Sequence, residues 1–325
     1  MANLYGFKIK LILYNKNSID YYIILTLIKK GKRKIEEAKL ENKKYWIWLS
    51  MLREIGNISK NKLLDKYKMP NRIYNLTYEE LKKEKWLNNK KIENILDKKI
   101  RNNLDKYIEN MIKKEIDIIT INESLYPKKL KEIYDVPICI YIKGNKNILN
   151  QNIIGIIGCR EASMYGIKAA KYFSYNLSKK GIIIVSGLAK GIDSFSHIGT
   201  IEANGKTIAV VGNGLDIIYP KENYYLEKKI IQKGGAIISE YPLGVKPEKM
   251  NFPARNRIIS GISKGIIVIE AKRKSGTLIT VDFALEQGRD VYVVPGNINS
   301  INSVGTNDLI KQGARLVTNY EEIEA

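Results

Sequence analysis

Six short apolar runs, each rich in β-branched residues, constrain the fold of this chain more than any other feature. Most of them are apolar at every position, which is typical of strands buried on both faces of a parallel sheet. Stretches with helical spacing separate them, among them Ile167–Lys179, Tyr224–Lys233 and Thr277–Gln287. This alternation predicts an open, mostly parallel α/β sheet with right-handed crossovers over residues 116–325. The predicted strands are Ile153–Ile157, Ile182–Val185, Thr207–Val211, Ala236–Ser239, Gly265–Glu270 and Val291–Val294.

The segment before the sheet has a different pattern. From about Tyr45 to Lys114, apolar residues recur at three- and four-residue spacing, which predicts a small all-helical domain over residues 41–115. We expect it to be of the SAM-like or helix-hairpin-helix-like kind, because the sequence from Ile55 to Leu64 resembles a hairpin turn that presents amides to a phosphate. A plain interhelical turn is the alternative. Residues 1–40 carry no motif, and we interpret them as a basic N-terminal extension, with an upstream start as the alternative.

Charge is the outlier of the composition. The chain has 55 Lys and Arg residues against 34 Asp and Glu, a formal net charge of +21. The excess is +13 in residues 1–120 and +8 in residues 121–325. Such a surplus favours a polyanion partner, because neutralised phosphates release condensed counterions. A lysine-rich bias, visible beside abundant Ile, Asn and Tyr, is the competing explanation.

Cysteine and histidine are too scarce for two classes of site. Cys139 and Cys159 are the two cysteines and His197 is the one histidine, which argues against a disulfide framework and an all-protein zinc site. We therefore predict no metal and no cofactor. The apolar run Tyr21–Ile28 is too short to span a bilayer and precedes no cleavage site, which predicts a cytoplasmic protein without a membrane partner.

Glycine-containing turns follow the predicted strands at the carboxyl edge of the sheet, where open α/β sheets bind their ligands. Glycine lets the backbone approach an anion closely, and the next helix offers free N–H groups. One such turn suits one phosphate, and several side by side suit an extended polyanion. A purely conformational role of each glycine is the competing interpretation. The binding candidates in these turns are Ser163, Ser186, Gly187, Lys190, Ser275, Gly276 and Thr277.

The stretch from Pro247 to Arg257 places cations on both sides of one aromatic residue, Phe252. A base stacked on such a ring, with phosphates on neighbouring cations, is the combination used for sequence-tolerant binding of single strands. Pro253 predicts an extended Phe252, and we expect the next helix to run over Asn256–Ser263. Alternatively, Phe252 is a core residue and Arg257 pairs with a buried acid such as Glu270. The candidates here are Lys249, Phe252, Arg255, Asn256 and Arg257.

Charged groups near the turns are open to two interpretations. Arg160, inside the first turn, faces a ligand or pairs with Glu161 or Asp193. Asp193, Asp216 and Glu240 hold Mg²⁺ or tie the amides of their own turns.

A nucleotide-binding enzyme is one rival function, because Gly212-Asn213-Gly214 and Glu240 supply two elements of a dinucleotide fingerprint. However, Ile217 occupies the third glycine position, and Pro220 follows where a phosphate-binding helix should run. A sensor of a nucleotide signal is the second rival. The sequence has no P-loop, and we expect His197 to be a structural hydrogen-bonding group, so we predict that the protein is not an enzyme.

Spaced signatures extend from Tyr126 to Ala314. They are Tyr126-Pro127 with Asp135, Pro137 and Tyr141; Arg160 with Ser163–Gly166; Ser186–Asp193; Gly212–Asp216 with Tyr219-Pro220; Ser239–Pro242 with Gly244; Phe252–Ile259; Glu270-Ala271; Ser275–Thr280; Pro295-Gly296; and Gly305–Ile310. In these signatures the chain closely resembles the DprA/Smf family of DNA-processing proteins of bacterial natural transformation.

The resemblance implies an extended Rossmann-like domain that binds single-stranded DNA, forms a homodimer, protects incoming DNA and loads RecA onto strands coated by single-strand-binding protein. The DNA contacts of the family fall on Arg160, the Ser186–Gly187 turn, Lys249 and Phe252. For the dimer we expect Leu309 and Ile310, on a short helix Thr306–Gln312, to contribute. Two departures stand out: Cys159 replaces a common Ser, and after Val317 we expect no C-terminal winged-helix domain.

Overall fold

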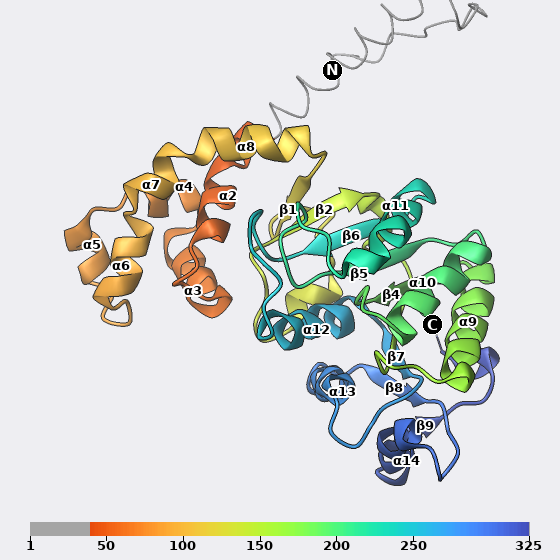
Figure 1. The fold of residues 1–325 in the computed structure, drawn as a ribbon. Helices are drawn as coiled ribbons and strands as arrows, with labels where there is room; N and C mark the ends of the chain where they lie inside the picture. Colours follow the sequence, from red (N-terminus) through yellow and green to blue (C-terminus); the bar gives the residue numbers. More distant parts are fainter. Residues whose placement is uncertain (1–39, 325) are drawn as a thin grey trace, which may run out of the picture.

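The computed structural model describes residues 40–324, so the predicted basic extension at residues 1–40 lies almost wholly outside the described residues. In the described part, the helices before the first strand form a unit of their own, shown in orange and yellow in Figure 1. Polar caps define several of them, for example the capping box of Thr77 and Glu80 at the start of α5. We call residues 44–113 the helical unit. Its helices are α2 (Lys44–Met51), α3 (Asn57–Tyr67), α4 (Pro70–Tyr74), α5 (Tyr78–Lys82), α6 (Asn89–Ile95), α7 (Lys98–Asn102) and α8 (Leu104–Lys113).

The rest of the described chain is built on one sheet with the strand order β1-β2-β6-β5-β4-β3-β7-β8-β9. The pairs β1–β2 and β2–β6 are antiparallel, and all the others are parallel. The predicted Rossmann-like, mostly parallel fold is therefore confirmed. The strands are β1 (Asp117–Thr120), β2 (Cys139–Gly144), β3 (Ile153–Ile157), β4 (Ile183–Ser186), β5 (Thr207–Val210), β6 (Ala236–Ser239), β7 (Gly265–Val268), β8 (Asp290–Val293) and β9 (Arg315–Leu316).

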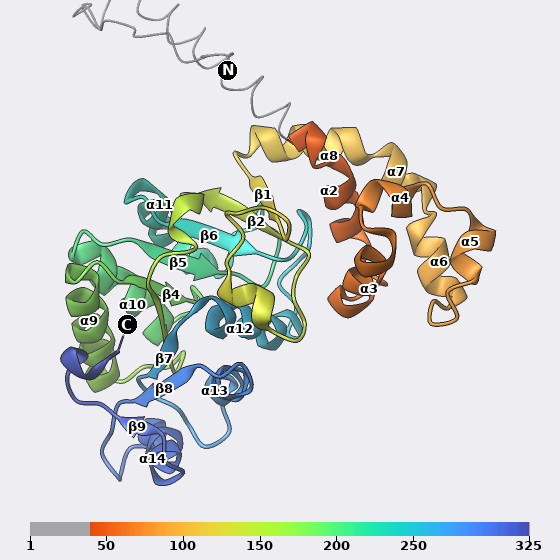
Figure 2. The same ribbon diagram turned by 180° about the vertical axis from the view of Figure 1, so that it is seen from behind.

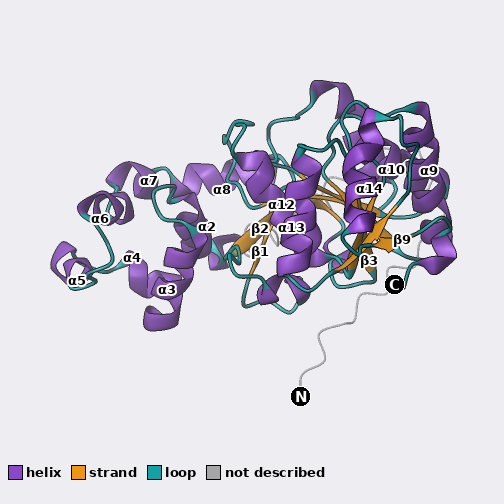
Figure 3. Ribbon diagram, turned by 90° about the horizontal axis from the view of Figure 1, so that it is seen from below, coloured by secondary structure: helices purple, strands orange, loops and turns teal. Residues whose placement is uncertain are grey.

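Helices cover both faces of this sheet, which explains why its strands are apolar on both sides. Ile153 belongs to the hydrophobic cluster beneath α12 and α13, and the next residue, Ile154, belongs to the cluster beneath α9. Figure 3 shows α12 and α13 side by side, away from α9 and α10. The bounds are α9 (Met164–Lys179), α10 (Ile192–Glu202), α11 (Tyr224–Gln232), α12 (Asn251–Ile262), α13 (Gly276–Glu286) and α14 (Val304–Lys311).

The helical unit packs on the edge of the sheet formed by β1 and β2 (Figure 2). One hydrophobic cluster is continuous between them, with Trp48 and Leu49 from α2 and Tyr141 from β2. None of the helices in residues 40–324 combines the length and the apolar character needed to cross a bilayer.

The structure differs from the sequence prediction in two strands and in the start of one helix, and both differences matter for the site. Strands β1 and β2 are not among the predicted strands, and they supply the surface on which the helical unit rests. Helix α12 begins at Asn251 and not at Asn256. Pro253 therefore lies in the first turn, where its missing N–H would have no helical partner in any case.

Candidate functional site

A pocket opens at the carboxyl ends of β3, β4 and β5, the edge at which α/β sheets bind ligands. The turn after each of these strands contributes to its wall, and the first turn of α12 closes one side. We call it the strand-end pocket. Its lining residues are Arg160, Gly187, Ala189, Lys190, Val211, Gly212, Asn213, Tyr219, Pro220, Phe252 and Arg255.

Two aromatic rings and a guanidinium lie together in this pocket. The centroid of the Phe252 ring is 5.5 Å from that of Tyr219, and the two ring planes are inclined by 35°. The Arg160 guanidinium carbon is 5.4 Å from the Phe252 centroid, within the range of a cation–π contact. Arg160 is exposed, and within residues 40–324 it takes part in no ion pair. The expected alternative partners are engaged elsewhere, since Glu161 pairs with Lys272 and Asp193 accepts backbone N–H groups.

Phe252 is half-buried and helical. The prediction that Pro253 keeps it extended is wrong, because a proline in the first turn does not break a helix. The ring nevertheless lines the strand-end pocket, and it is absent from the buried hydrophobic core of the described residues. Its position agrees with an aromatic group at a binding edge.

The turn after β4 is held by a buried carboxylate. The Oδ2 atom of Asp193 accepts the N–H groups of Gly187 and Ala189, at 3.1 and 3.3 Å. Gly191 has a φ of +76°, and a Cβ there would lie 2.3 Å from the carbonyl oxygen of Arg160, so this position requires glycine. The interpretation of Asp193 as a residue that ties the amides of its own turn fits this geometry, which also fixes the backbone of Arg160.

Arg255 lies beneath the pocket, 4% exposed. Its Nη1 atom donates to the carbonyl oxygens of Gly187, at 2.7 Å, and of Val210, and its Nε atom donates to Asn256 at 3.1 Å. Burial lowers its pKa to about 10, although the Asp193 carboxylate opposes this shift. Arg255 thus braces the ends of β4 and β5 and adds positive potential to the pocket floor.

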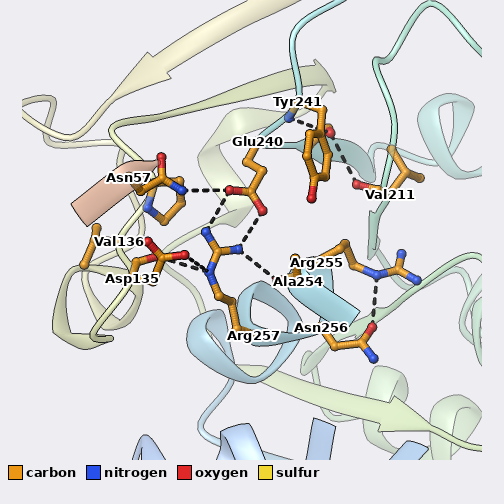
Figure 4. Close-up of polar contacts among 12 residues, drawn as sticks. Asn57, Asp135, Val136, Val211, Glu240, Tyr241, Ala254, Arg255, Asn256 and Arg257 are labelled. Atoms are coloured by element: carbon orange, nitrogen blue, oxygen red, sulfur yellow. Dashed lines mark hydrogen bonds and ion pairs between the residues drawn. The ribbon is translucent and has the colours of Figure 1, made fainter. Parts of the chain in front are cut away.

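Arg257 is placed differently from the phosphate contact that the sequence predicts. It points to the side of α12 opposite Arg255 (Figure 4) and is 5% exposed. Its Nη1 and Nη2 atoms donate to the two oxygens of Glu240 at 2.6 and 2.7 Å, and its Nε atom donates to Asp135 at 3.1 Å. Burial acts to lower its pKa, but the two carboxylates raise it above the ordinary value. With Asn57, these residues form what we call the Arg257 cluster; the acid that pairs with Arg257 is Glu240 and not Glu270.

Of the two lysines among the predicted binding residues, Lys190 lines the strand-end pocket and Lys249 does not. Lys190, in its wall, is exposed and forms an ion pair of 2.5 Å with Glu222. Lys249 is exposed just before α12, and within residues 40–324 it has no ion-pair partner. Lys249 therefore resembles Arg160 in having a charge available to a ligand.

The predicted serines have intramolecular partners. Ser163 caps α9 by accepting the N–H of Gly166, and its hydroxyl lies 2.5 Å from Glu270. Ser186 is fully buried, and its hydroxyl donates to the carbonyl of Ile156 at 2.6 Å. Both side chains shape the turns, and neither lines the strand-end pocket.

The candidate turn Ser275, Gly276 and Thr277 lies outside the pocket at the start of α13. Asn256 connects it to α12, because its Nδ2 atom donates to the Gly276 carbonyl at 3.4 Å. The Ser275 hydroxyl oxygen is buried and has no hydrogen-bond partner among the described residues. This turn therefore does not line the pocket. Asn256 connects it to Arg255, which does.

His197 is fully buried on α10, and its Nδ1 atom lies 2.7 Å from the Thr207 hydroxyl. Burial lowers its pKa to about 3, so the ring is neutral at physiological pH, as expected of a structural group. Asp216 accepts the N–H of Gly244 at 2.9 Å. Among residues 40–324, no group of three or more His, Cys, Asp or Glu side chains is arranged to hold a metal ion.

The residues expected at a dimer contact lie in or against the core. Leu309, on α14, is 9% exposed and belongs to the hydrophobic cluster beneath α12 and α13. Ile310 is half-buried against the same cluster. A dimer contact through the Leu309 side chain is therefore not supported by its position.

Tyr219 belongs to one of the sequence signatures but is not among the predicted binding residues. It is 40% exposed and lies in the loop after β5, far in sequence from Phe252. An aromatic residue in a glycine-rich turn at a strand end was the available signal.

Comparisons with known proteins agree with this fold. The family model of DNA recombination-mediator protein A matches residues 117–325. Protein Smf of Escherichia coli is 44% identical over 206 residues, which cover 63% of this chain and 55% of that protein. The chain thus spans about half the length of this relative.

Two solved structures are similar. The X-ray structure of DNA processing protein A of Streptococcus pneumoniae has a TM-score of 0.73 at 35% identity and covers 87% of this chain and 98% of that one. A structure that describes the single-stranded DNA binding mode of DNA processing protein A from Helicobacter pylori has a TM-score of 0.58 at 30% identity. It covers 63% of this chain and 93% of that one.

Proposed function

The chain belongs to the DprA/Smf family of DNA recombination-mediator proteins, and from this premise we propose that it binds single-stranded DNA through the strand-end pocket, as a mediator and not as an enzyme. The observation that carries the proposal is the grouping of Phe252, Tyr219 and Arg160 in this pocket. Lys249, three residues before Phe252 in the chain, is a further exposed cation. Aromatic faces accept any base by stacking, and neighbouring cations meet the phosphates.

The charges of this pocket support a polyanion ligand. Arg160 and Lys249 are exposed and have no carboxylate partner within residues 40–324, whereas Arg255 holds a positive charge beneath the floor. When such cations neutralise phosphates, the counterions condensed on the nucleic acid are released to solution, which favours binding at low salt. The similar Helicobacter pylori protein is described by its single-stranded DNA binding mode, which agrees with this choice of ligand.

The proposal is tested by titrating the full chain with fluorescent oligo-dT at several salt concentrations. We expect binding that weakens steeply with salt and prefers single strands to duplex. Arg160→Ala should lower both the affinity and the salt dependence, by roughly 0.7 in the slope of log K against log salt for each lost phosphate contact. An Arg160→Ala protein with wild-type affinity at every salt concentration would contradict the assignment.

We further propose that the bound strand is protected and passed to RecA, including strands coated by single-strand-binding protein, in the cytoplasm during uptake of DNA. This step rests on the family alone. The test is RecA filament formation on coated oligonucleotides, which the protein should accelerate and which Arg160→Ala should slow. No acceleration at saturating protein would remove this step and leave DNA binding intact.

The homodimer is proposed on the last strand rather than on Leu309. Strand β9 is the exposed edge of the sheet, and Leu316 on it is 44% exposed. An edge strand presents unpaired backbone groups that a second copy can pair with. Light scattering should give twice the chain mass at micromolar concentration, and Leu316→Arg should give a monomer; a monomeric wild type would exclude the dimer.

The dinucleotide-enzyme alternative has a weaker geometric basis. After β5 the chain forms a loop, and the next α-helix, α11, begins only at Tyr224. Asn213 fills the turn by donating to the carbonyl of Ile217 at 2.6 Å. A thermal-shift screen of nucleotides should therefore show no stabilisation comparable to that by oligo-dT.

A further inference from the structure

Two asparagines on one face of α3 connect the helical unit to the Arg257 cluster. The Nδ2 atom of Asn57 donates to Glu240 at 3.0 Å, and the Nδ2 atom of Asn61, one turn later, donates to the carbonyl of Val136 at 2.8 Å. Val136 follows Asp135 in the chain. Asn57 thus binds Glu240 directly, and Asn61 binds the residue next to Asp135. These are the two acids that pair with Arg257 (Figure 4).

Arg257 transmits this placement to α12. Besides its bonds to Glu240 and Asp135, it donates to the carbonyl of Ala254, in the first turns of its own helix. Phe252 and Arg255 belong to this same end of α12 and contribute to the strand-end pocket. A small rotation of α12 would therefore move the Phe252 ring relative to Arg160 and Tyr219.

We propose that the helical unit positions the DNA-binding edge: Asn57 and Asn61 fix the acids that hold Arg257, and through them the orientation of the first turn of α12. This inference rests on the proposed function of the strand-end pocket. In it, Asn57 and Asn61 are positioning residues that touch no DNA. Both asparagines belong to the predicted phosphate-binding hairpin from Ile55 to Leu64, and their side chains make contacts within the protein.

Other bonds keep the helical unit in place when these asparagines are changed. The Ser50 and Tyr141 hydroxyls lie 2.5 Å apart, and the N–H of Leu243 donates to the Tyr107 hydroxyl at 2.7 Å. The continuous hydrophobic cluster adds apolar contact. Asn57 and Asn61 are themselves half-buried, so their alanine variants remove single hydrogen bonds without opening the core.

The experiment compares the full-length Asn57→Ala, Asn61→Ala and double variants with wild type in the salt titration with oligo-dT. We expect the double variant to bind about tenfold more weakly, equivalent to about 1.4 kcal/mol. The slope of log K against log salt should stay at the wild-type value, because no phosphate contact is lost. Hydrogen exchange of residues 251–262 should be faster in the double variant. Asn94→Ala is the matched control, since Asn94 accepts the Glu54 N–H within the helical unit.

Each other outcome has a defined meaning. A lowered salt slope in the double variant would show that the turn meets phosphate directly and would overturn the positioning role. Wild-type affinity in the double variant, together with weakened binding by Arg160→Ala, would overturn this inference and leave the proposed function standing. If wild type itself does not bind oligo-dT, the proposed function fails first. If the double variant melts early, Asn57→Asp, which places a carboxylate next to Glu240, is the second test. We expect it to weaken binding without changing the slope of log K against log salt. Unchanged binding or a changed slope would overturn the inference.

Discussion

Cations lie on both sides of α12, but in opposite circumstances. On one side, Arg257 forms ion pairs with Glu240 and Asp135 and is buried. On the other, Arg160 lies beside Phe252, and Lys249 is exposed just before the helix; neither has a carboxylate partner in the described residues. The comparison teaches that the number of cations in a motif does not measure its capacity for phosphate. What counts is which charges the protein leaves uncompensated.

The largest effect should come from Arg257→Ala. It leaves the carboxylate of Glu240 buried without its counter-charge, which costs about 3–5 kcal/mol of unfolding free energy. Urea unfolding measures this loss. Arg273→Ala is the control, because Arg273 is 75% exposed in its ion pair with Asp308 and should contribute less than about 1 kcal/mol. If Arg257→Ala were as stable as wild type but bound DNA with a lower salt slope, Arg257 would be a phosphate contact and not a structural ion pair.

A buried lysine near the Arg257 cluster also predicts that the stability of the protein depends on pH. Lys60, buried on α3 between the two asparagines, has its pKa lowered from 10.5 to about 8 by burial, against the opposing effect of nearby acids. The folded state therefore releases this proton before the unfolded state does, and stability rises between pH 8 and pH 10.5. The gain should be about 1.4 kcal/mol per pH unit relative to Lys60→Met. Equal slopes of unfolding free energy against pH in both proteins would contradict it.

On the pocket side, Phe252→Ala tests the stacking surface. Loss of one base contact should cost about 1–3 kcal/mol of oligo-dT binding, with little change in melting temperature. A core phenylalanine would instead cost about 3–5 kcal/mol of stability through the cavity left behind. Both quantities are measured on one purified variant, beside Tyr225→Ala, an exposed aromatic on α11, as control. A variant that melts far earlier yet binds normally when folded would show that Phe252 is a core residue and not a stacking surface.

The smallest effect is expected from Lys249→Ala. Removing one exposed cation should lower the salt slope by roughly 0.7 and reduce the affinity slightly at low salt. Lys233→Ala is the matched control, because Lys233 is exposed at the opposite edge of the sheet, before β6. Identical slopes for the two variants would show that Lys249 is not part of the binding edge.

Much of this molecule follows from local pattern. The runs Ile153–Ile157 and Ala236–Ser239 are strands at the predicted residues, because β-branched chains buried on both faces suit only the interior of a covered sheet. The turn after β4 follows equally, since a glycine-rich turn needs a nearby acid to bind its amides, and Asp193 does so. Parallel strands then bring Arg160 and Gly187 to one edge without further information.

The division of labour between Arg255, Arg257 and Phe252 required the tertiary structure. Two residues apart on a helix, Arg255 and Arg257 point about 200° away from each other, and nothing in the local sequence says which one lies at the strand-end pocket. The orientation of Arg257 depends on Glu240 and Asp135, which bind it from two distant parts of the chain, and on Asn57, which donates a hydrogen bond to Glu240 from a third. A sequence displays its cations, but their partners are fixed only when folding brings remote segments together, because an ion pair depends on distance in space and not along the chain.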